Sequence, residues 1–156
     1  MVSKVEGIDP RELQSLQIYL NEYRQQAEIF TQQLALLEEG RVEALTAIDA
    51  IMGIKESPAD TILLQLGGGA SVRARMVEPE RVLLNVGADV IVERSSEEAV
   101  EYLKDRLTEM EASAKKVVET LDQLKYQMNE IARRLESGYQ QYQMQQARPV
   151  PGENQE

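Results

Sequence analysis

The sequence predicts a mainly α-helical chain: a long antiparallel coiled-coil hairpin of two α-helices, with two β-hairpins between the helices. Two apolar ladders with alternating three- and four-residue spacing predict the helices, because a period of 3.5 residues keeps one seam of a helix against a partner. Between the ladders the apolar pattern changes to a period of two, which is typical of strands. Composition agrees, since only 4% of the 156 residues are aromatic and 28% are charged, which is little material for a compact core.

The first helix is expected over residues 10–52. Asp9 is a typical N-cap residue, and Pro10 follows it at the first helical position, where a missing N–H costs nothing. Gly53 can adopt the left-handed conformation that ends many helices, and Pro58 prevents a later continuation. The ladder of this helix comprises Leu13, Leu16, Leu20, Tyr23, Ala27, Phe30, Leu34, Leu37, Arg41, Ala44, Ile48 and Ile51.

The second helix is expected over residues 96–146, followed by a disordered tail over residues 147–156. Residues 95–98 read Ser-Ser-Glu-Glu, a capping-box pattern, and no proline interrupts the chain before Pro149. The second ladder comprises Val100, Leu103, Leu107, Met110, Ala114, Val117, Leu121, Leu124, Met128, Ile131, Leu135, Gly138 and Tyr142.

One register pairs the two ladders so that large residues meet small or flexible ones. In this register Leu13 faces Gly138, and Leu37 faces Ala114. A register in which the two ladders are shifted by one heptad is the alternative. The whole chain, residues 1–156, is expected to form a single domain.

Four short strands are expected between the helices, over residues 60–66, 70–77, 81–86 and 89–93. Glycine-containing turns at 67–69 and 87–88 connect them into two hairpins within residues 60–93. Isolated hairpins are marginally stable in water, so their apolar faces are expected to need partner strands and to cause oligomerisation. The residues expected on these faces are Ile62, Leu64, Leu66, Val72, Val82, Leu84, Val86, Val90 and Val92.

Charge and residue types exclude several classes of function. A net charge of −10 argues against nucleic acid or an anionic membrane as a partner, because both attract clustered Lys and Arg. The chain has no Cys and no His, which removes thiolate catalysis and the usual zinc ligands. The glycine run at 67–69 lacks the Lys-Ser/Thr of a phosphate loop. The sequence therefore predicts no cofactor, no metal and no enzymatic activity. It also lacks the apolar run of about 20 residues that spans a membrane, so we expect a soluble cytoplasmic protein.

Residues 66–72 read Leu-Gly-Gly-Gly-Ala-Ser-Val, and residues 82–99 lead from the second expected hairpin into the second expected helix. Through these two stretches above all, the chain resembles the alpha subunits of archaeal prefoldin, and the resemblance extends from about Leu13 to Tyr142. It implies a heterohexamer of two alpha and four beta subunits, joined through β-barrels of their hairpins. It also implies ATP-independent capture of unfolded proteins and their delivery to a group II chaperonin.

The free ends of the two helices are the candidate client-binding region. If the helices separate there, seam residues lose their partner and expose apolar surface. Residues 139–146 are uncharged, and flexible Met with amphipathic Tyr suits a surface that accepts many sequences. The candidate client-binding residues are Leu13, Leu16, Leu135, Tyr139, Tyr142 and Met144, with Leu20 and Ile131 beside them. For the five aliphatic residues the alternative is an ordinary buried seam position.

A structural coiled-coil adaptor with fixed native partners is the alternative function. Its helices would pair with partner helices and would bind folded proteins specifically. An enzyme that uses carboxylates alone ranks third, because a narrow coiled coil supplies no concave apolar pocket in which a pKa could shift.

Overall fold

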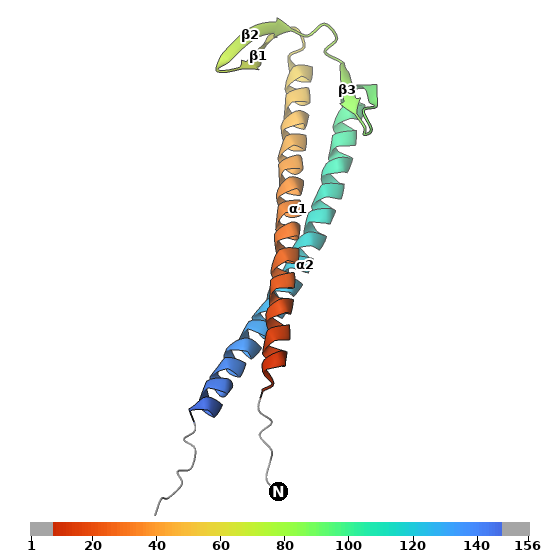
Figure 1. The fold of residues 1–156 in the computed structure, drawn as a ribbon. Coiled ribbons are helices and arrows are strands. Elements are labelled where there is room, and N and C mark those ends of the chain that lie inside the picture. The colour runs from red at the N-terminus through yellow and green to blue at the C-terminus, as the bar shows by residue number, and fades with distance from the viewer. Residues whose placement is uncertain (1–7, 148–156) are drawn as a thin grey trace, which may run out of the picture. The chain divides into compact units, whose positions relative to one another are not determined.

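The computed structural model describes residues 8–147. Its elements follow the predicted order of two long helices with two β-hairpins between them (Figure 1). They are α1 (Pro10–Glu56), β1 (Thr61–Gly67), β2 (Ala70–Arg75), β3 (Arg81–Asn85), β4 (Ile91–Ser95) and α2 (Ser96–Gln146). Residues 148–156, most of the predicted disordered tail, lie outside the described part of the chain.

The chain divides into two compact units. The hairpin unit comprises Ala35–Lys115, and the terminal unit comprises residues 8–34 and 116–147 of the described chain. Helices α1 and α2 contribute residues to both units.

Both helices begin where the sequence predicts, because side chains satisfy the first backbone amides. At the start of α1, the Arg11 amide donates a hydrogen bond of 2.9 Å to Oδ1 of Asp9. At the start of α2, the Glu98 amide donates to Oγ of Ser95 at 3.2 Å, and the Ser95 amide donates back to Oε2 of Glu98 at 3.3 Å. This reciprocal pair is a capping box.

Helix α1 ends four residues later than predicted, at Glu56 instead of residue 52. Gly53 remains helical, and its carbonyl accepts a hydrogen bond of 3.3 Å from the Ser57 amide. Glycine permits a left-handed conformation but does not impose it. The following proline ends the helix instead, because Pro58 disfavours the helical conformation at Ser57.

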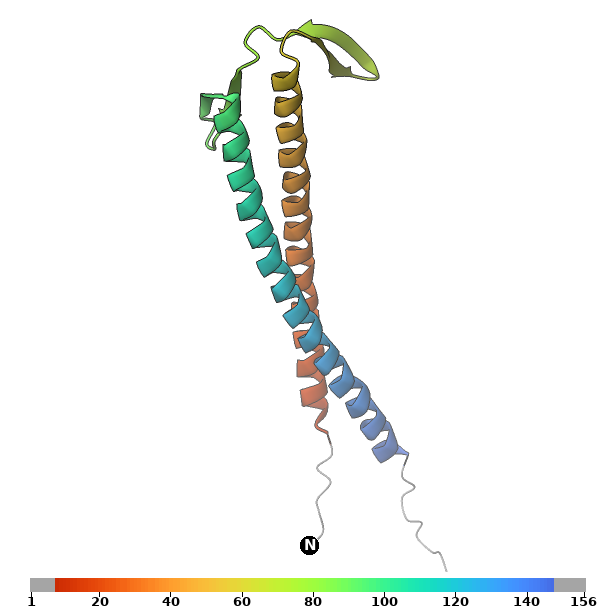
Figure 2. The same cartoon turned by 180° about the vertical axis from the view of Figure 1, so that it is seen from behind.

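Each hairpin is a separate two-stranded antiparallel sheet, β1 with β2 and β3 with β4 (Figures 1 and 2). The second turn is longer than predicted, so β4 begins at Ile91 and the predicted strand over residues 89–93 is displaced by two residues. Ala88 and Asp89 have positive φ values of 49° and 59°, and the Val90 amide donates to the carbonyl of Gly87 at 2.9 Å. Two consecutive left-handed residues are typical of the type I′ turn, whose twist suits a hairpin.

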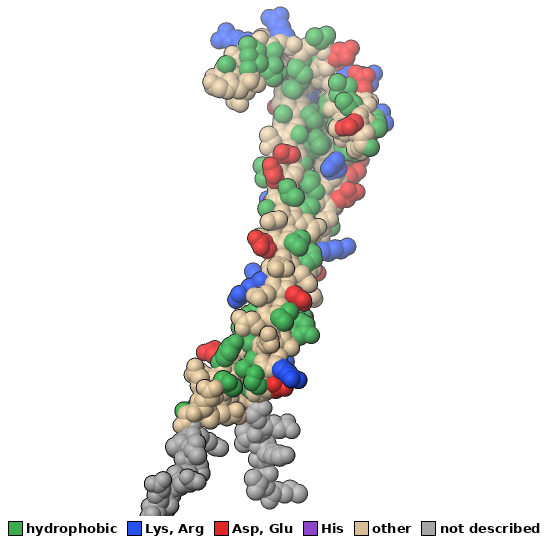
Figure 3. Space-filling model, in the orientation of Figure 1, with side chains coloured by type: hydrophobic (Ala, Val, Ile, Leu, Met, Phe, Trp, Pro, Cys, Tyr) green, Lys and Arg blue, Asp and Glu red, His purple; other side chains and the backbone are tan. Residues whose placement is uncertain are grey.

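The hairpin strands bury little of their apolar surface within one chain. Of the residues predicted on the apolar faces, Leu84 is buried and Ile62, Val82 and Val92 are half-buried. The other five, which are Leu64, Leu66, Val72, Val86 and Val90, are exposed. Figure 3 shows apolar side chains on the surface of these strands.

The helical seam is confirmed in both units. Every predicted ladder residue is buried or half-buried apart from Tyr142. In the terminal unit Leu13 packs against Gly138, as the predicted register requires. In the hairpin unit Nζ of Lys55 lies 2.6 Å from Oε1 of Glu97, so the end of α1 lies beside the start of α2. Over residues 8–147, no helix combines the length and the hydrophobicity needed to cross a membrane.

Candidate functional site

The terminal unit brings the start of α1 and the end of α2 together around an apolar cluster. Leu13, Leu20 and Leu135 form its buried centre, and Leu13 and Leu135 are only 5% and 7% exposed. The half-buried residues around this centre are Ile8, Leu16, Met128 and Ile131. Leu13, Leu16 and Leu135 therefore occupy seam positions in the free chain, which was the alternative that the sequence left open for them.

Gly138 allows the two helices to approach closely at this cluster. A Cβ atom placed at Gly138 would collide with Cδ2 of Leu13 and would lie 3.3 Å from Cδ1 of Ile8. Because glycine has no Cβ, the Leu13 side chain occupies that space. Leu13 is thereby fixed between the helices, where it also lines a surface pocket.

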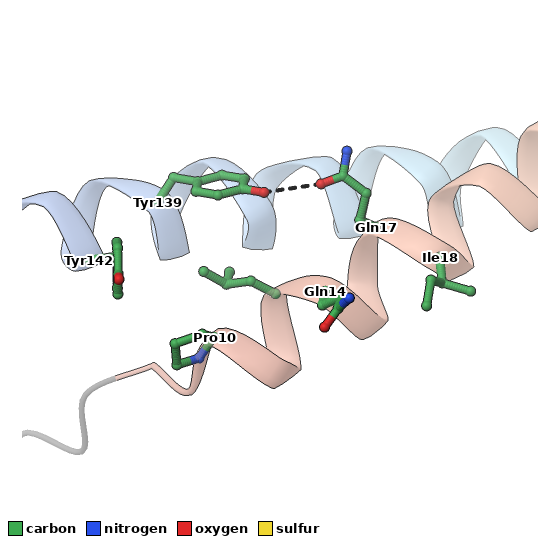
Figure 4. A pocket seen from close by; sticks show the side chains of 7 residues that line it. Pro10, Gln14, Gln17, Ile18, Tyr139 and Tyr142 are labelled. Atoms are coloured by element: carbon green, nitrogen blue, oxygen red, sulfur yellow. Dashed lines mark hydrogen bonds between the residues drawn. The ribbon is translucent and has the colours of Figure 1, made fainter.

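This pocket, called here the Tyr139 pocket, has a volume of about 420 Å³ (Figure 4). Two tyrosines from α2 and five residues from the first turns of α1 line it. The lining residues are Pro10, Leu13, Gln14, Gln17, Ile18, Tyr139 and Tyr142. The hydroxyl of Tyr139 donates a hydrogen bond of 3.0 Å to Oε1 of Gln17, which connects the two helices across the pocket.

The lining of the Tyr139 pocket carries no charged side chain, although the chain has a net charge of −10. It offers aliphatic surface, two aromatic rings and two neutral amides. Such a lining binds apolar groups and can also exchange hydrogen bonds with neutral polar groups. Residues 8–147 contain no group of acidic side chains placed to hold a metal ion.

Three of the six predicted client-binding residues, Leu13, Tyr139 and Tyr142, meet at this pocket. Leu16 and Leu135 belong to the cluster beneath it, and Met144 is 72% exposed and does not line it.

Four lining residues were not predicted from the sequence, namely Pro10, Gln14, Gln17 and Ile18. One signal was available for two of them. Leu13 and Leu16 occupy the a and d positions of a heptad, so Pro10 and Gln17 lie at e positions, which flank the seam.

Comparisons with known proteins point to one family. The family profile described as Prefoldin subunit matches residues 23–141. The prefoldin subunit alpha of Methanoregula boonei is 59% identical over 134 residues, which cover 86% of this chain and 88% of that relative.

Two solved structures are similar in fold. A filamentous PFD from Methanocaldococcus jannaschii aligns with this chain at a TM-score of 0.62 and 17% identity. The alignment covers 73% of this chain and 95% of the PFD chain. The prefoldin beta subunit from Thermococcus strain KS-1 aligns at a TM-score of 0.56 and 20% identity. This alignment covers 85% of this chain and 96% of the beta subunit.

Proposed function

Because the chain belongs to the prefoldin family of chaperone subunits, we propose that it is an ATP-independent holdase subunit that binds unfolded or nascent proteins at the Tyr139 pocket. The uncharged apolar lining of this pocket carries the proposal. An unfolded protein exposes apolar side chains that such a lining can cover, whatever the net charge of the client.

The expected strength of one contact fits temporary holding. Burial of one large aliphatic or aromatic side chain contributes about 1.5–3 kcal/mol, which is less than the roughly 4 kcal/mol of a millimolar complex. A single pocket would therefore release its client readily. Several subunits that bind one client together would raise the overall affinity through avidity.

The assembly is part of the proposal. Exposed apolar residues on two short sheets with free edges, such as Leu66 and Val72, support pairing with strands of other subunits. We propose that the chain acts as one prefoldin-like domain in a cytoplasmic heterohexamer of two alpha and four beta subunits. The hairpins would join in β-barrels, and the clients would pass to a group II chaperonin.

Light scattering tests the holding activity. A chemically unfolded model protein is diluted without nucleotide into the full chain assembled with a cognate beta subunit. Ile18→Ser removes an exposed apolar side chain from the pocket, and Ile29→Ser removes a similarly exposed isoleucine elsewhere on α1. We expect Ile18→Ser to weaken the suppression of aggregation and Ile29→Ser to leave it unchanged.

Two results would contradict the proposal. Equal effects of the two substitutions would remove the pocket from client binding. A verified wild-type assembly that fails to suppress aggregation would favour the coiled-coil adaptor with fixed native partners.

A further inference from the structure

We propose that the Tyr139 pocket recognises the peptide backbone of its client, and that the side-chain amides of Gln14 and Gln17 form hydrogen bonds with it. The preferred partner is an extended, uncharged segment with one large apolar side chain and unpaired peptide groups. This inference rests on the proposed function and specifies the kind of segment that the pocket accepts.

The hydrogen bond from Tyr139 fixes the orientation of the Gln17 amide. Its Oε1 accepts from the Tyr139 hydroxyl at 3.0 Å, so its amino group is left to donate. Gln14 lines the same pocket, and its side chain forms no hydrogen bond to any other residue within 8–147. Its amide therefore offers a donor and an acceptor together.

The spacing of these two amides suits an extended chain. Gln14 and Gln17 are three residues apart on α1, so their Cβ atoms lie about 5–6 Å apart on one face of the helix. In an extended chain, peptide groups that point to the same side recur every two residues, which is roughly 6.6–7 Å. Flexible glutamine side chains can span the small difference.

This mode of recognition separates unfolded clients from native proteins. In a native protein the great majority of buried backbone groups are already paired, so an apolar surface patch offers few free peptide donors and acceptors. An unfolded segment offers both beside every apolar side chain. Without the two amides, the apolar lining would not distinguish an unfolded segment from an apolar patch on a native protein.

Peptides with single ester bonds test the inference. An uncharged nine-residue peptide with a central Phe is titrated against the full chain assembled with its beta subunit, and esters then replace each of the four amides around the Phe in turn. An ester removes one N–H donor and keeps the side chains. We expect at least one ester to weaken binding by about 3- to 10-fold, the usual contribution of one hydrogen bond.

Gln14→Leu supplies the decisive comparison because it preserves apolar area and removes the amide. In this variant the same ester should weaken binding by less than about 2-fold, whatever the variant does to overall affinity. Gln25→Leu, on an exposed part of α1 away from the pocket, should retain the full ester effect. Equal ester effects in wild type and Gln14→Leu would overturn this inference alone, and failure of the wild-type assembly to bind any of the peptides would overturn the proposed function with it.

Discussion

Glycines in the two helices differ in what surrounds the missing side chain. A Cβ atom at Gly53 would meet no atom within 4 Å, whereas a Cβ atom at Gly138 would collide with the buried side chain of Leu13. Gly53 therefore only weakens its helix, and Gly138 also permits close packing beside the Tyr139 pocket.

We predict opposite effects of alanine at these two positions. Gly53→Ala should raise the free energy of unfolding by about 0.5–1 kcal/mol, because alanine favours the helix. Gly138→Ala should lower it by about 1 kcal/mol, because overpacking of 1–3 kcal/mol exceeds the gain in helix propensity. Urea denaturation of the full chain, followed by circular dichroism, measures both values. An increase for both variants would contradict the close packing at Leu13.

The β3–β4 hairpin is an element whose turn is conformationally costly. Ala88 and Asp89 both adopt left-handed backbone conformations. This conformation costs roughly 1–2 kcal/mol for alanine, whereas aspartate tolerates it more readily. The Gly87 amide donates to Oδ1 of Asn85 at 3.1 Å, which helps to fix this turn.

Replacement of the first left-handed residue should stabilise the hairpin. We expect Ala88→Gly to raise the free energy of unfolding by about 0.5–1 kcal/mol, since the relief of strain exceeds the added freedom of the unfolded chain. Ala70→Gly, at the start of β2 where φ is not positive, should lower it. Thermal denaturation of the two variants compares them directly, and a loss of stability in Ala88→Gly would refute the strain.

The end of α1 and the start of α2 are connected by an ion pair that titrates. The hydrogen bond from Lys55 to Glu97 lowers the pKa of the Glu97 carboxyl, and a backbone hydrogen bond and the lysine charge act in the same direction. A carboxyl with a lowered pKa in the folded state stabilises the fold above its unfolded pKa, and this contribution is lost as pH falls through its folded pKa.

Carboxyl NMR titration of Glu97 tests this link. We predict that Lys55→Met raises the pKa of Glu97. The free energy of unfolding should then lose the part of its pH dependence that Glu97 contributes at acidic pH. Lys104→Met, which removes a lysine two turns further along α2, should leave that pKa nearly unchanged. The same pKa in wild type and Lys55→Met would show that the pair is absent in solution.

At the scale of the whole molecule, the hairpin strands of a single chain leave apolar side chains and strand edges uncovered. Two-stranded sheets with free edges and apolar surface are unfavourable in water. Lysine on an edge strand discourages pairing with other strands because the charge would have to be buried.

We therefore expect Leu66→Lys combined with Val72→Lys to reduce the mass of the assembly, with helical content preserved. Leu36→Lys, at an exposed position on α1 outside the strands, is the control and should leave the mass unchanged. Light scattering coupled to size-exclusion chromatography measures both. Unchanged mass in the strand variant would exclude these strands from the interface.

The sequence predicted the helices well because their signals are periodic and local. The seam repeats over many heptads, and both N-caps lie within four residues of chain, so neither depends on distant packing. Gly53 was misread because glycine tolerates both a helix and its end. The shifted start of β4 was missed because Ala88, unlike Asp89, is not a typical left-handed residue.

Less of the candidate site than of the fold could be predicted from the sequence. Tyr139 and Tyr142 stood out by residue type, whereas Gln14 resembles any polar residue on a helix surface and Gln17 differs from such residues only in flanking the seam. Their role depends on which α2 residues lie opposite them, and the seam alone does not specify which flank opens into a pocket. The burial of Leu13 likewise depends on a close approach of the two helices, which the missing Cβ of Gly138 permits.

The packing of Leu13 against Gly138 has a consequence for the order of folding. The entropic cost of closing a loop grows with its length, so contacts between residues close in sequence form at lower cost than distant ones. Each hairpin is local, and Lys55 and Glu97 are separated only by the hairpins, whereas nearly the whole chain separates Leu13 from Gly138. We therefore expect helix pairing to begin beside the hairpins and to reach the Tyr139 pocket at the end. The part of the chain that we propose binds unfolded proteins would itself be the last to fold.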